Sequence, residues 1–430
     1  MLDKRKPTVF ELGKNVRIEI WGGLNSIGGN CVVIKDRDEG LMLDQGLSFS
    51  QFKKFYGGFI EPEIVEDLRE IGAIPPKEAY ENVLEVYISH LHIDHLGSLS
   101  IPFEYDVKLY VPSKYTLEKL SRFWTWGWKE LLLPSDFDLT ELEDISVSEK
   151  VKAIQVSHSA FPAYSFLVET SEGTIFYSGD FRTKSPLCIN TLENFNSIEG
   201  SVDVAIVEGT NFLRRQTPLT PNDVVRILKR ILDKYKRNYL FLSIHPLDVE
   251  SFLLASKVLQ EYEFTPVLTH TKYAELFDMQ LKLLKLSGLP KFYLLPLRGE
   301  PPIPLHFIEI VEKEEVLSME KKAFLTSITG TSELKMLIKL CGIKPAGLFQ
   351  ITLVGEPLDE EGWIAEERLM SWLRKFGIDS FRIHLSGHYY PYEFKEIIHI
   401  LKPKQLIPIH TNTPKHMKTL FEKYSSQIIN

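Results

Sequence analysis

Short apolar runs separated by glycine-rich or polar turns fill the first half of the chain, and they predict β-strands. Residues 17–21 alternate apolar and polar side chains, and apolar runs at 30–34 and 41–44 follow the glycine-rich turn 22–29. Strands joined by such short connections form a β-meander, so these glycines are not a dinucleotide fingerprint, which must open a helix. Further strands are predicted at 86–89, 107–111, 151–158, 164–169, 173–180 and 202–208.

The pattern changes after this region. An amphipathic helix is predicted at 218–236, a strand at 238–243, a helix at 249–262 and a strand at 265–269. Alternating strands and helices indicate a parallel sheet and therefore a separate α/β unit. The last elements predicted are a strand at 381–384, a helix at 391–401 and a strand at 406–410.

Composition adds limits to this picture. A chain of 430 residues exceeds one ordinary core, so we expect two domains. It is 44% hydrophobic and 25% charged, as in ordinary globular proteins. No long apolar run predicts a membrane span, and residues 1–15 lack the apolar core of a signal peptide, so we expect no membrane association and a cytoplasmic protein. Cys31, Cys188 and Cys341 have no Cys-x-x-Cys spacing, so neither a disulfide framework nor a thiolate metal site is predicted.

The net charge of −8 does not favour a nucleic-acid-binding protein, but it does not exclude one. Local basic clusters could contact a polyanion even in an acidic chain, and the alternative for each cluster is a solvated surface. The candidates are Lys53-Lys54, Arg214-Arg215 and the group Lys229, Arg230, Lys234, Lys236 and Arg237.

The segment VYISHLHIDHLG, residues 86–97, carries the strongest chemical signal. A buried strand leads into His90, His92, Asp94 and His95. Imidazole nitrogens and carboxylate oxygens are ligands for zinc, manganese and iron. A single histidine would more often be a hydrogen-bonded core residue, but four ligand-type residues at H-x-H-x-D-H spacing predict a metal site.

Other ligand-type residues end predicted strands further along the chain. His158 and Asp180 end two of them, and Glu208 ends a third. Near the C-terminus His388 follows a strand in the motif SGH, and His410 ends the last strand. Each would be unremarkable alone, and together they predict a site assembled at strand ends.

In this combination the sequence resembles the metallo-β-lactamase superfamily and, within it, the β-CASP branch of RNase J-like ribonucleases. H-x-H-x-D-H, VSHS around His158, YSGDFR around Asp180, Glu208-Gly-Thr, SGH and PIH carry the resemblance, together with the opening GGLNSIGGNCVVI. It implies an αββα metallo-β-lactamase sandwich with an inserted Rossmann-like α/β domain. The implied boundaries are 1–211 and 383–430 for the two parts of the metallo-β-lactamase domain, and 212–382 for the β-CASP domain.

The resemblance also implies a ligand set for two divalent ions, most simply Zn²⁺, with Mn²⁺ as the alternative. One ion would be held by His90, His92, His158 and Asp180, the other by Asp94, His95, Asp180 and His410. Asp44, in LDQG, would orient the histidine loop from outside the ligand set; on sequence alone it could equally be a turn-forming aspartate.

The implied activity is hydrolysis of phosphodiester bonds in single-stranded RNA, with a metal-activated water and without a protein nucleophile. His388, held by Glu208, is the candidate general acid, and Asp94 belongs to both the catalytic and the ligand sets. His388 could instead bond a backbone carbonyl. Substrate contacts are expected at His384, Ser386 and Tyr389. Tyr389 and Tyr390 replace the Ala-Ser that commonly follows SGH in this family, so their rings could narrow a 5′-phosphate pocket or stack on a base, and both 5′–3′ exonuclease and endonuclease activity stay open.

Two other classes of function stay open as well. One is a thioester or lactone hydrolase of the same fold, and the other is a non-catalytic RNA-binding subunit, which would usually have lost metal ligands. Trp124, Trp126 and Trp128 could stack on bases, although a partner contact or half-buried surface is the simpler interpretation. A homodimer is compatible with the sequence.

Overall fold

The computed structural model describes residues 5–56, 60–97, 107–123, 139–142, 150–187, 189–198, 202–214, 217–297, 304–327, 330–339, 341–355 and 360–426. Trp124, Trp126, Trp128, Cys188 and Arg215 lie outside these residues.

The first of three sheets opens with the predicted meander. Strands β1 to β4 pair antiparallel in chain order, and β5 and later strands pair parallel. The change occurs where helices α1 (Phe49–Phe55) and α2 (Val65–Glu70) lengthen the connection, since a parallel pair needs a crossover. The strands are β1 (Thr8–Leu12), β2 (Val16–Gly22), β3 (Cys31–Asp36), β4 (Glu39–Leu43), β5 (Val83–Tyr87), β6 (Lys108–Val111) and β7 (Thr140–Glu141).

The second sheet joins the middle of the chain to its end. Its order is β19-β11-β10-β9-β8, and β19 pairs parallel with β11, Ile409 facing Glu208. The C-terminal return of the chain is therefore hydrogen-bonded to the strand that precedes the insertion. The strands are β8 (Val151–Val156), β9 (Ala163–Thr170), β10 (Gly173–Tyr177), β11 (Val204–Glu208) and β19 (Gln405–Ile409).

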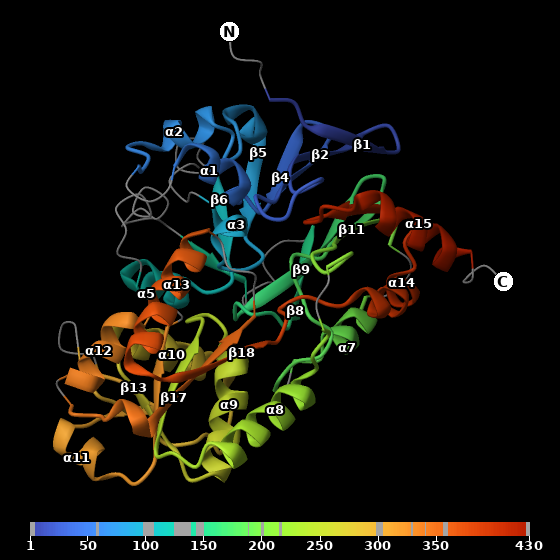
Figure 1. Ribbon diagram of the computed structural model, residues 1–430. Helices are drawn as coiled ribbons and strands as arrows, with labels where there is room; N and C mark the ends of the chain where they lie inside the picture. Colours follow the sequence, from blue (N-terminus) through green and yellow to red (C-terminus); the bar gives the residue numbers. More distant parts are fainter. Residues whose placement is uncertain are drawn as a thin grey trace.

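These two sheets pack face to face. One apolar cluster joins Ile18 and Val32 of the first sheet to Phe166, Val204 and Ile407 of the second. Helices cover the outer faces: α1, α2 and α5 (Lys114–Phe123) pack on the first sheet, and α7 (Thr191–Asn196), α14 (Phe394–Leu401) and α15 (Pro414–Ser425) on the second. The result is the predicted αββα sandwich, the upper part of the molecule in Figure 1.

The third sheet is parallel throughout, in the order β15-β14-β13-β16-β12-β17-β18. Its central strands are apolar on both faces, because helices cover both sides, and all seven residues of β17 are buried. The sheet strands are β12 (Tyr239–Ile244), β13 (Thr265–Leu268), β14 (Phe292–Leu294), β15 (Ile308–Ile310), β16 (Lys322–Thr326), β17 (Leu348–Val354) and β18 (Asp379–His384), and the helices are α8 (Pro221–Lys234), α9 (Val249–Glu261), α10 (Thr271–Leu284), α11 (Lys313–Ser318), α12 (Thr331–Lys339) and α13 (Glu360–Phe376).

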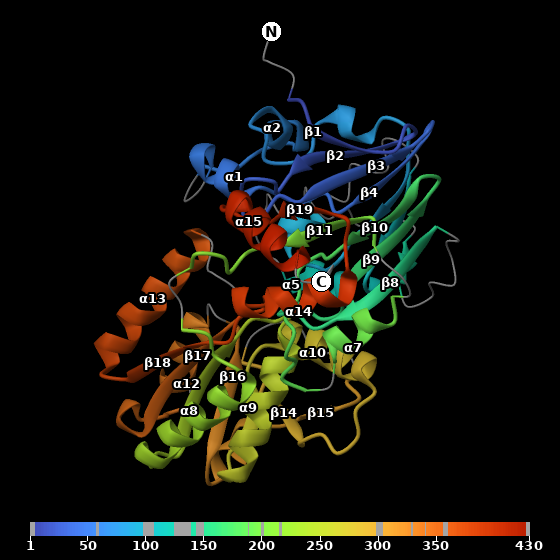
Figure 2. The same cartoon turned by 90° about the vertical axis from the view of Figure 1, so that its right-hand side faces the viewer.

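Helices α8, α9 and α10 share one apolar core with this sheet, and α11, α12 and α13 share the core on the other face. A sheet wound on both sides is Rossmann-like, as predicted. The unit forms the lower part of Figure 1, and Figure 2 shows α14, α15 and β19 back beside β11 in the upper part.

Helix α8 shows how local sequence sets an element boundary. Thr220 and Asp223 form a capping box, and Pro221 occupies the first helical position. These residues satisfy the first backbone N–H groups and supply a helical φ angle. The helix therefore begins at Pro221, three residues after the predicted start. Within the described part of the chain, no helix is long and apolar enough to cross a membrane.

Candidate metal centre

The histidine loop, which carries His90, His92, Asp94 and His95, begins where β5 ends. Its backbone is hydrogen-bonded to the loop after β4 and to the turn before β3. The backbone N–H of Gln45 donates to the carbonyl of His95, and Asn30 N–H donates to the carbonyl of Asp94. A Cβ on Gly46 would stand 1.6 Å from the Asp94 carbonyl oxygen, so only glycine permits this approach. The short helix α3 (Ile93–Leu96) follows and carries Asp94 and His95, whose ring lies 4.0 Å from that of His90.

Three imidazoles converge at one side of this loop. His90 Nε2 and His158 Nε2 lie 3.1 Å and 3.2 Å from His92 Nδ1. Nitrogens bound to one tetrahedral zinc ion, each about 2.0 Å from the metal, are themselves roughly 3.3 Å apart. The spacing of the three nitrogens therefore fits one ion.

A second group gathers beside the first. His410 Nε2 lies 3.1 Å from Asp94 Oδ2. Asp180 Oδ2 lies 3.0 Å from His95 Nε2 and 3.6 Å from His410 Nε2, and Asp180 also groups with His90 and His95. Asp180 therefore stands between the two sets of imidazoles. All seven residues predicted as ligands are brought together, although they come from positions up to 320 residues apart.

Buried partners fix the orientation of several rings. Asp44 Oδ2 accepts from His95 Nδ1 at 2.7 Å, from the Tyr177 hydroxyl at 2.6 Å and from the Ser89 hydroxyl at 2.8 Å. This bond between His95 Nδ1 and Asp44 fixes the orientation of the ring, so that Nε2 faces Asp180. The structure thus places Asp44 directly behind the histidine loop, the arrangement that an orienting role requires.

His158 and His410 are held in the same way. His158 Nδ1 donates to the carbonyl of Gly387 at 2.8 Å, and His410 Nδ1 lies 2.7 Å from the Thr210 hydroxyl. In each case the other ring nitrogen points into the cluster. An imidazole whose outer nitrogen is occupied presents the inner one as a metal ligand.

The charges and the burial within the cluster shift the pKa values of its members. Burial and the neighbouring imidazoles of His95 and His158 lower the pKa of His90 well below its usual value. Burial alone would lower the pKa of His95, but Asp180 and Asp44 outweigh it and raise that pKa well above the usual value. Burial opposes ionisation of Asp180, yet His410, His95 and His388 hold its pKa well below the usual range.

The donor set fits divalent ions. Asp180 is 2% exposed, and its Oδ1 has no hydrogen-bond partner among the residues that the structure describes. A buried carboxylate oxygen without a partner is costly unless a cation supplies the charge. Nitrogen and oxygen donors in two adjacent groups, with no thiolate, suit Zn²⁺ or Mn²⁺.

His388 and Glu208 border the same cluster. His388 Nδ1 lies 3.0 Å from Glu208 Oε1 and 3.9 Å from Asp180 Oδ2, and both side chains are almost completely buried. Glu208 also accepts from the backbone N–H of Thr210 at 2.8 Å, which holds the carboxylate in place. The partner of His388 Nδ1 is therefore a carboxylate and not the backbone carbonyl considered as the alternative.

Ser386 and His384 lead up to His388. Ser386 is buried, and its hydroxyl accepts from the backbone N–H of His388 at 3.1 Å and from the Asn211 amide at 2.9 Å. These bonds give Ser386 a role in holding the SGH turn. His384 is the last residue of β18 and is partly exposed.

The prediction that Tyr389 contacts the substrate is wrong. Its ring is 1% exposed and stacks on Phe181, with centroids 4.9 Å apart, and its hydroxyl donates to the backbone carbonyl of Glu208 at 2.6 Å. The large ring gains apolar burial by packing into the core beneath the site. Tyr390 is partly exposed, and its hydroxyl accepts from the backbone N–H of Leu219 at 3.3 Å.

Several residues of this region were not predicted from the sequence. His245 follows β12, and its ring lies 5.5 Å from that of His92. Thr210 and Asn211 support His410 and the SGH turn, and Arg182 bonds the backbone of His158. Thr210 and Arg182 belong to the motifs EGT and GDFR already singled out, and this adjacency was the available signal.

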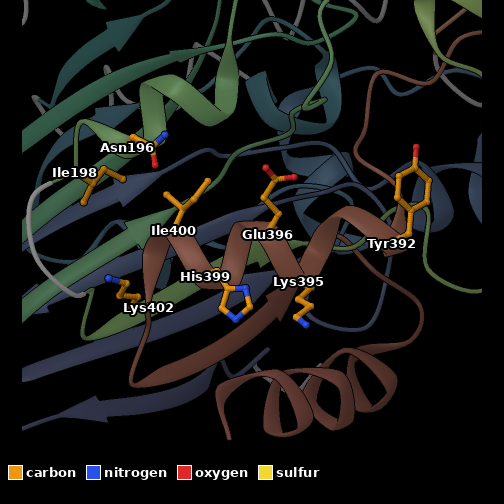
Figure 3. A pocket seen from close by; sticks show the side chains of 8 residues that line it. All are labelled: Asn196, Ile198, Tyr392, Lys395, Glu396, His399, Ile400 and Lys402. Carbon is orange, nitrogen blue, oxygen red and sulfur yellow. The ribbon is translucent and has the colours of Figure 1, made fainter. Parts of the chain in front are cut away.

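A cavity of about 700 Å³ lies outside this cluster, against the outer surface of α14. Figure 3 shows Lys395 and His399 on that helix, Tyr392 before it and Lys402 after it, with Asn196 and Ile198 opposite Ile400. Its lining includes none of the residues that converge at the metal centre.

The αββα fold and the converging ligand-type residues are similar to those of the metallo-β-lactamase superfamily, and residues 63–243 match the β-lactamase superfamily domain. Over most of its length the chain is similar to proteins named Ribonuclease J. The Pyrococcus abyssi protein is 22% identical over 92% of this chain and 89% of its own length, and the Mycoplasma genitalium protein is 22% identical over 98% of this chain and 72% of its own length. A crystal structure of a protein of unknown function from Enterococcus faecalis V583 shares the fold, with a TM-score of 0.69 and 20% identity over 94% of this chain and 95% of that one.

Proposed function

We propose that this protein is an RNase J-like ribonuclease that hydrolyses phosphodiester bonds of single-stranded RNA at a centre of two divalent ions. The observation that carries the proposal is the placement of the His388–Glu208 pair against the seven converging ligands. The metal ligands alone would suit any hydrolase of this superfamily. The added acid–carboxylate pair suits a reaction in which a leaving oxygen must receive a proton.

The proposed ligand groups are His90, His92, His158 and Asp180 for one ion, and Asp94, His95, Asp180 and His410 for the other. Zn²⁺ is the ion we propose, with Mn²⁺ as the alternative. A bound pair of such ions supplies an activated water and neutralises charge on the phosphoryl oxygens. The protein holds the seven donors in place, with His92 and Asp94 half-buried and the others buried, so that their charges act with little screening.

His388 delivers a proton to the leaving oxygen. Its Nδ1 is engaged by Glu208, so Nε2 is the nitrogen that transfers the proton. The carboxylate behind the ring fixes the tautomer and supports the positive charge that the protonated imidazole carries. Asp94 acts as a ligand, and its Oδ2 lies 3.1 Å from His410 Nε2.

We propose RNA as the substrate because the curated relatives over most of this chain are named Ribonuclease J. We further propose the division into residues 1–211, 212–382 and 383–430, with β18 extending two residues past the second boundary. His384 and Ser386 remain proposed substrate contacts, and a cytoplasmic location and a homodimer remain predictions.

The test is incubation of the metal-loaded protein with a 5′-labelled single-stranded RNA. Release of mononucleotides identifies a 5′–3′ exonuclease, and internal fragments identify an endonuclease. Matched RNAs with a 5′-monophosphate, 5′-triphosphate or 5′-hydroxyl test whether the terminus is read. Absence of cleavage with both Zn²⁺ and Mn²⁺ would contradict the proposal and leave a small-molecule hydrolase or an RNA-binding subunit.

A further inference from the structure

The loop that carries His158 is bonded to the inserted unit as well as to its own domain. The backbone N–H of Phe161 donates at 3.0 Å to the carbonyl of Leu247, a residue that follows β12. The carbonyl of Gly387 orients His158. The N–H of Gly387 donates at 2.9 Å to the carbonyl of Gly355, which follows β17. Two supports of His158 thus lead to strands of the third sheet.

Arg182 joins the two units at the same point. It is 3% exposed, and its guanidinium donates to the backbone carbonyl of His158 at 2.8 Å and to Asp248 Oδ1 at 3.2 Å. Its Nε donates to the Ser157 hydroxyl at 3.1 Å. A buried guanidinium needs a compensating charge, and here Asp248 of the inserted unit supplies it.

Asp248 and its neighbour Glu250 begin helix α9. Asp248 caps the helix by accepting from the backbone N–H of Ser251, and Glu250 accepts from the hydroxyls of Ser157 and Ser185 at 2.7 Å each. Burial raises the pKa of Glu250, against the effect of Arg182. Both acidic side chains are 1% exposed.

Close packing leaves this junction little freedom. A Cβ on Gly355 would stand 2.5 Å from the Cβ of Ser159 and 3.0 Å from Asp248 Oδ2. The strand end β17, the first turn of α9 and the His158 loop therefore meet without a gap. Tight contacts of this kind transmit a displacement from one element to the next.

His95 and His410 are supported differently. Asp44 of the first sheet holds His95, and Thr210, which follows β11, holds His410. These supports lie in the αββα sandwich itself. Among the ligand orientations described above, that of His158 is the one that depends on the inserted unit.

We propose that Arg182 and Asp248 are positioning residues that couple the placement of the inserted unit to the metal group of His90, His92 and His158. When the unit is docked, Arg182 and Gly387 fix the backbone and ring of His158. When the unit is displaced, Arg182 loses its bond to Asp248 and Gly387 loses its bond to Gly355, so both hold His158 less firmly and its group binds metal more weakly. The coupling rests on the proposed metal centre but not on the RNA substrate, so a failure of RNA cleavage would leave it standing.

The first test is the variant Asp248→Asn, which keeps a good helix cap but removes the charge that faces Arg182. Asp379→Asn is the matched control, because Asp379 pairs with Arg237 on the surface of the same unit. Competition of Zn²⁺ against a chromophoric chelator measures both affinities. We expect one site of Asp248→Asn to weaken by about 10- to 100-fold, with the other unchanged, as for residues that support metal ligands. Two unchanged affinities in a folded Asp248→Asn protein would overturn the proposal.

The second test uses the unaltered protein and so does not depend on a variant that folds. Linkage is reciprocal: if docking strengthens metal binding, metal binding must stabilise docking. Hydrogen exchange measured with and without Zn²⁺ should show faster exchange at residues 247–253 after Zn²⁺ is removed. Helix α8, on the same unit, is the internal control and should not change. Equal exchange at residues 247–253 in both states would overturn the coupling.

Discussion

His388 Nδ1 lies 3.0 Å from Glu208 Oε1, although the two residues are 180 positions apart. The strand β11 delivers Glu208, and the turn after β18 delivers His388. Because β11 pairs with β19, the same sheet edge also delivers His410. The pairing of β11 with β19 thus brings Glu208, which holds the proposed proton donor, beside His410.

Replacement of His388 should separate chemistry from metal binding. We expect His388→Ala to retain the metal content of the wild type and to lower kcat by about 10²- to 10⁴-fold, the usual contribution of a general acid. Metal analysis and single-turnover cleavage of RNA check this. Glu208→Gln and the double variant should show strongly non-additive losses if the two residues act as one unit. Loss of metal in His388→Ala would mean that the residue is a ligand.

Metal removal should destabilise the fold. The chelated protein retains several buried imidazoles that face one another and a carboxylate oxygen without a partner, and ion binding to the folded state relieves both. At a free metal concentration of 100 times Kd we expect about 2.7 kcal/mol of added stability. Thermal unfolding with EDTA and after return of Zn²⁺ measures the difference. A Tm that does not respond to either treatment would contradict the centre.

Stability of the metal-free protein should depend on pH through His90 and His95. The raised pKa of His95 means that the folded state keeps a proton that the unfolded state releases above pH 6.5, so this contribution falls as pH rises beyond that value. The lowered pKa of His90 means that the unfolded state takes up a proton below pH 6.5 that the folded state does not, so this contribution falls as pH drops.

These two groups together therefore favour a maximum in the unfolding free energy of the metal-free protein near pH 6.5. Urea unfolding of the metal-free protein across pH 5 to 9, compared with that of His95→Gln, measures the effect. The decline above the maximum should be weaker in the variant. Metal should remove the decline, because binding requires neutral imidazole and strengthens as pH rises.

Asp44→Asn tests the support of the histidine loop. Asp44 has a φ of +58°, a conformation that asparagine also tolerates, so the substitution changes the side chain and not the turn. The amide cannot accept all the bonds that now converge on the carboxylate, from His95, Tyr177 and Ser89. We expect metal affinity to fall by about 10- to 100-fold. If affinity is unchanged in the folded variant, Asp44 is only a turn residue.

Tyr389→Phe tests the structural role assigned to this ring. The variant leaves the buried carbonyl of Glu208 without its hydroxyl donor, which should cost about 1–3 kcal/mol of unfolding free energy. KM for 5′-phosphorylated RNA should stay within about twofold, because the ring does not reach the open side of the site. A large rise in KM with unchanged stability would restore Tyr389 as a substrate contact.

The helices and strands that were predicted correctly are those whose local residue pattern determines their secondary structure. The glycine-joined meander, the strand into His90 and the βα alternation after Glu208 are confirmed, with boundaries moved by a few residues. Helix α10 was missed because it is buried on most sides, with Glu275, Asp278 and Gln280 inside, so it lacks a polar face. Asp278 there accepts from the backbone of His306 and Phe307, contacts with no local signal.

The sequence by itself determined the chemistry: which side chains could bind metal, and that they follow strands. The residue types that bind metal and the periodicity of strands are local properties, so they can be recognised in the sequence alone. Tertiary structure decided what those residues face. It placed Glu208 against His388, turned Tyr389 into the core and tied His158 to Arg182 and Asp248. These relationships arise from strand pairing and packing between residues distant in the chain, and no local pattern encodes them.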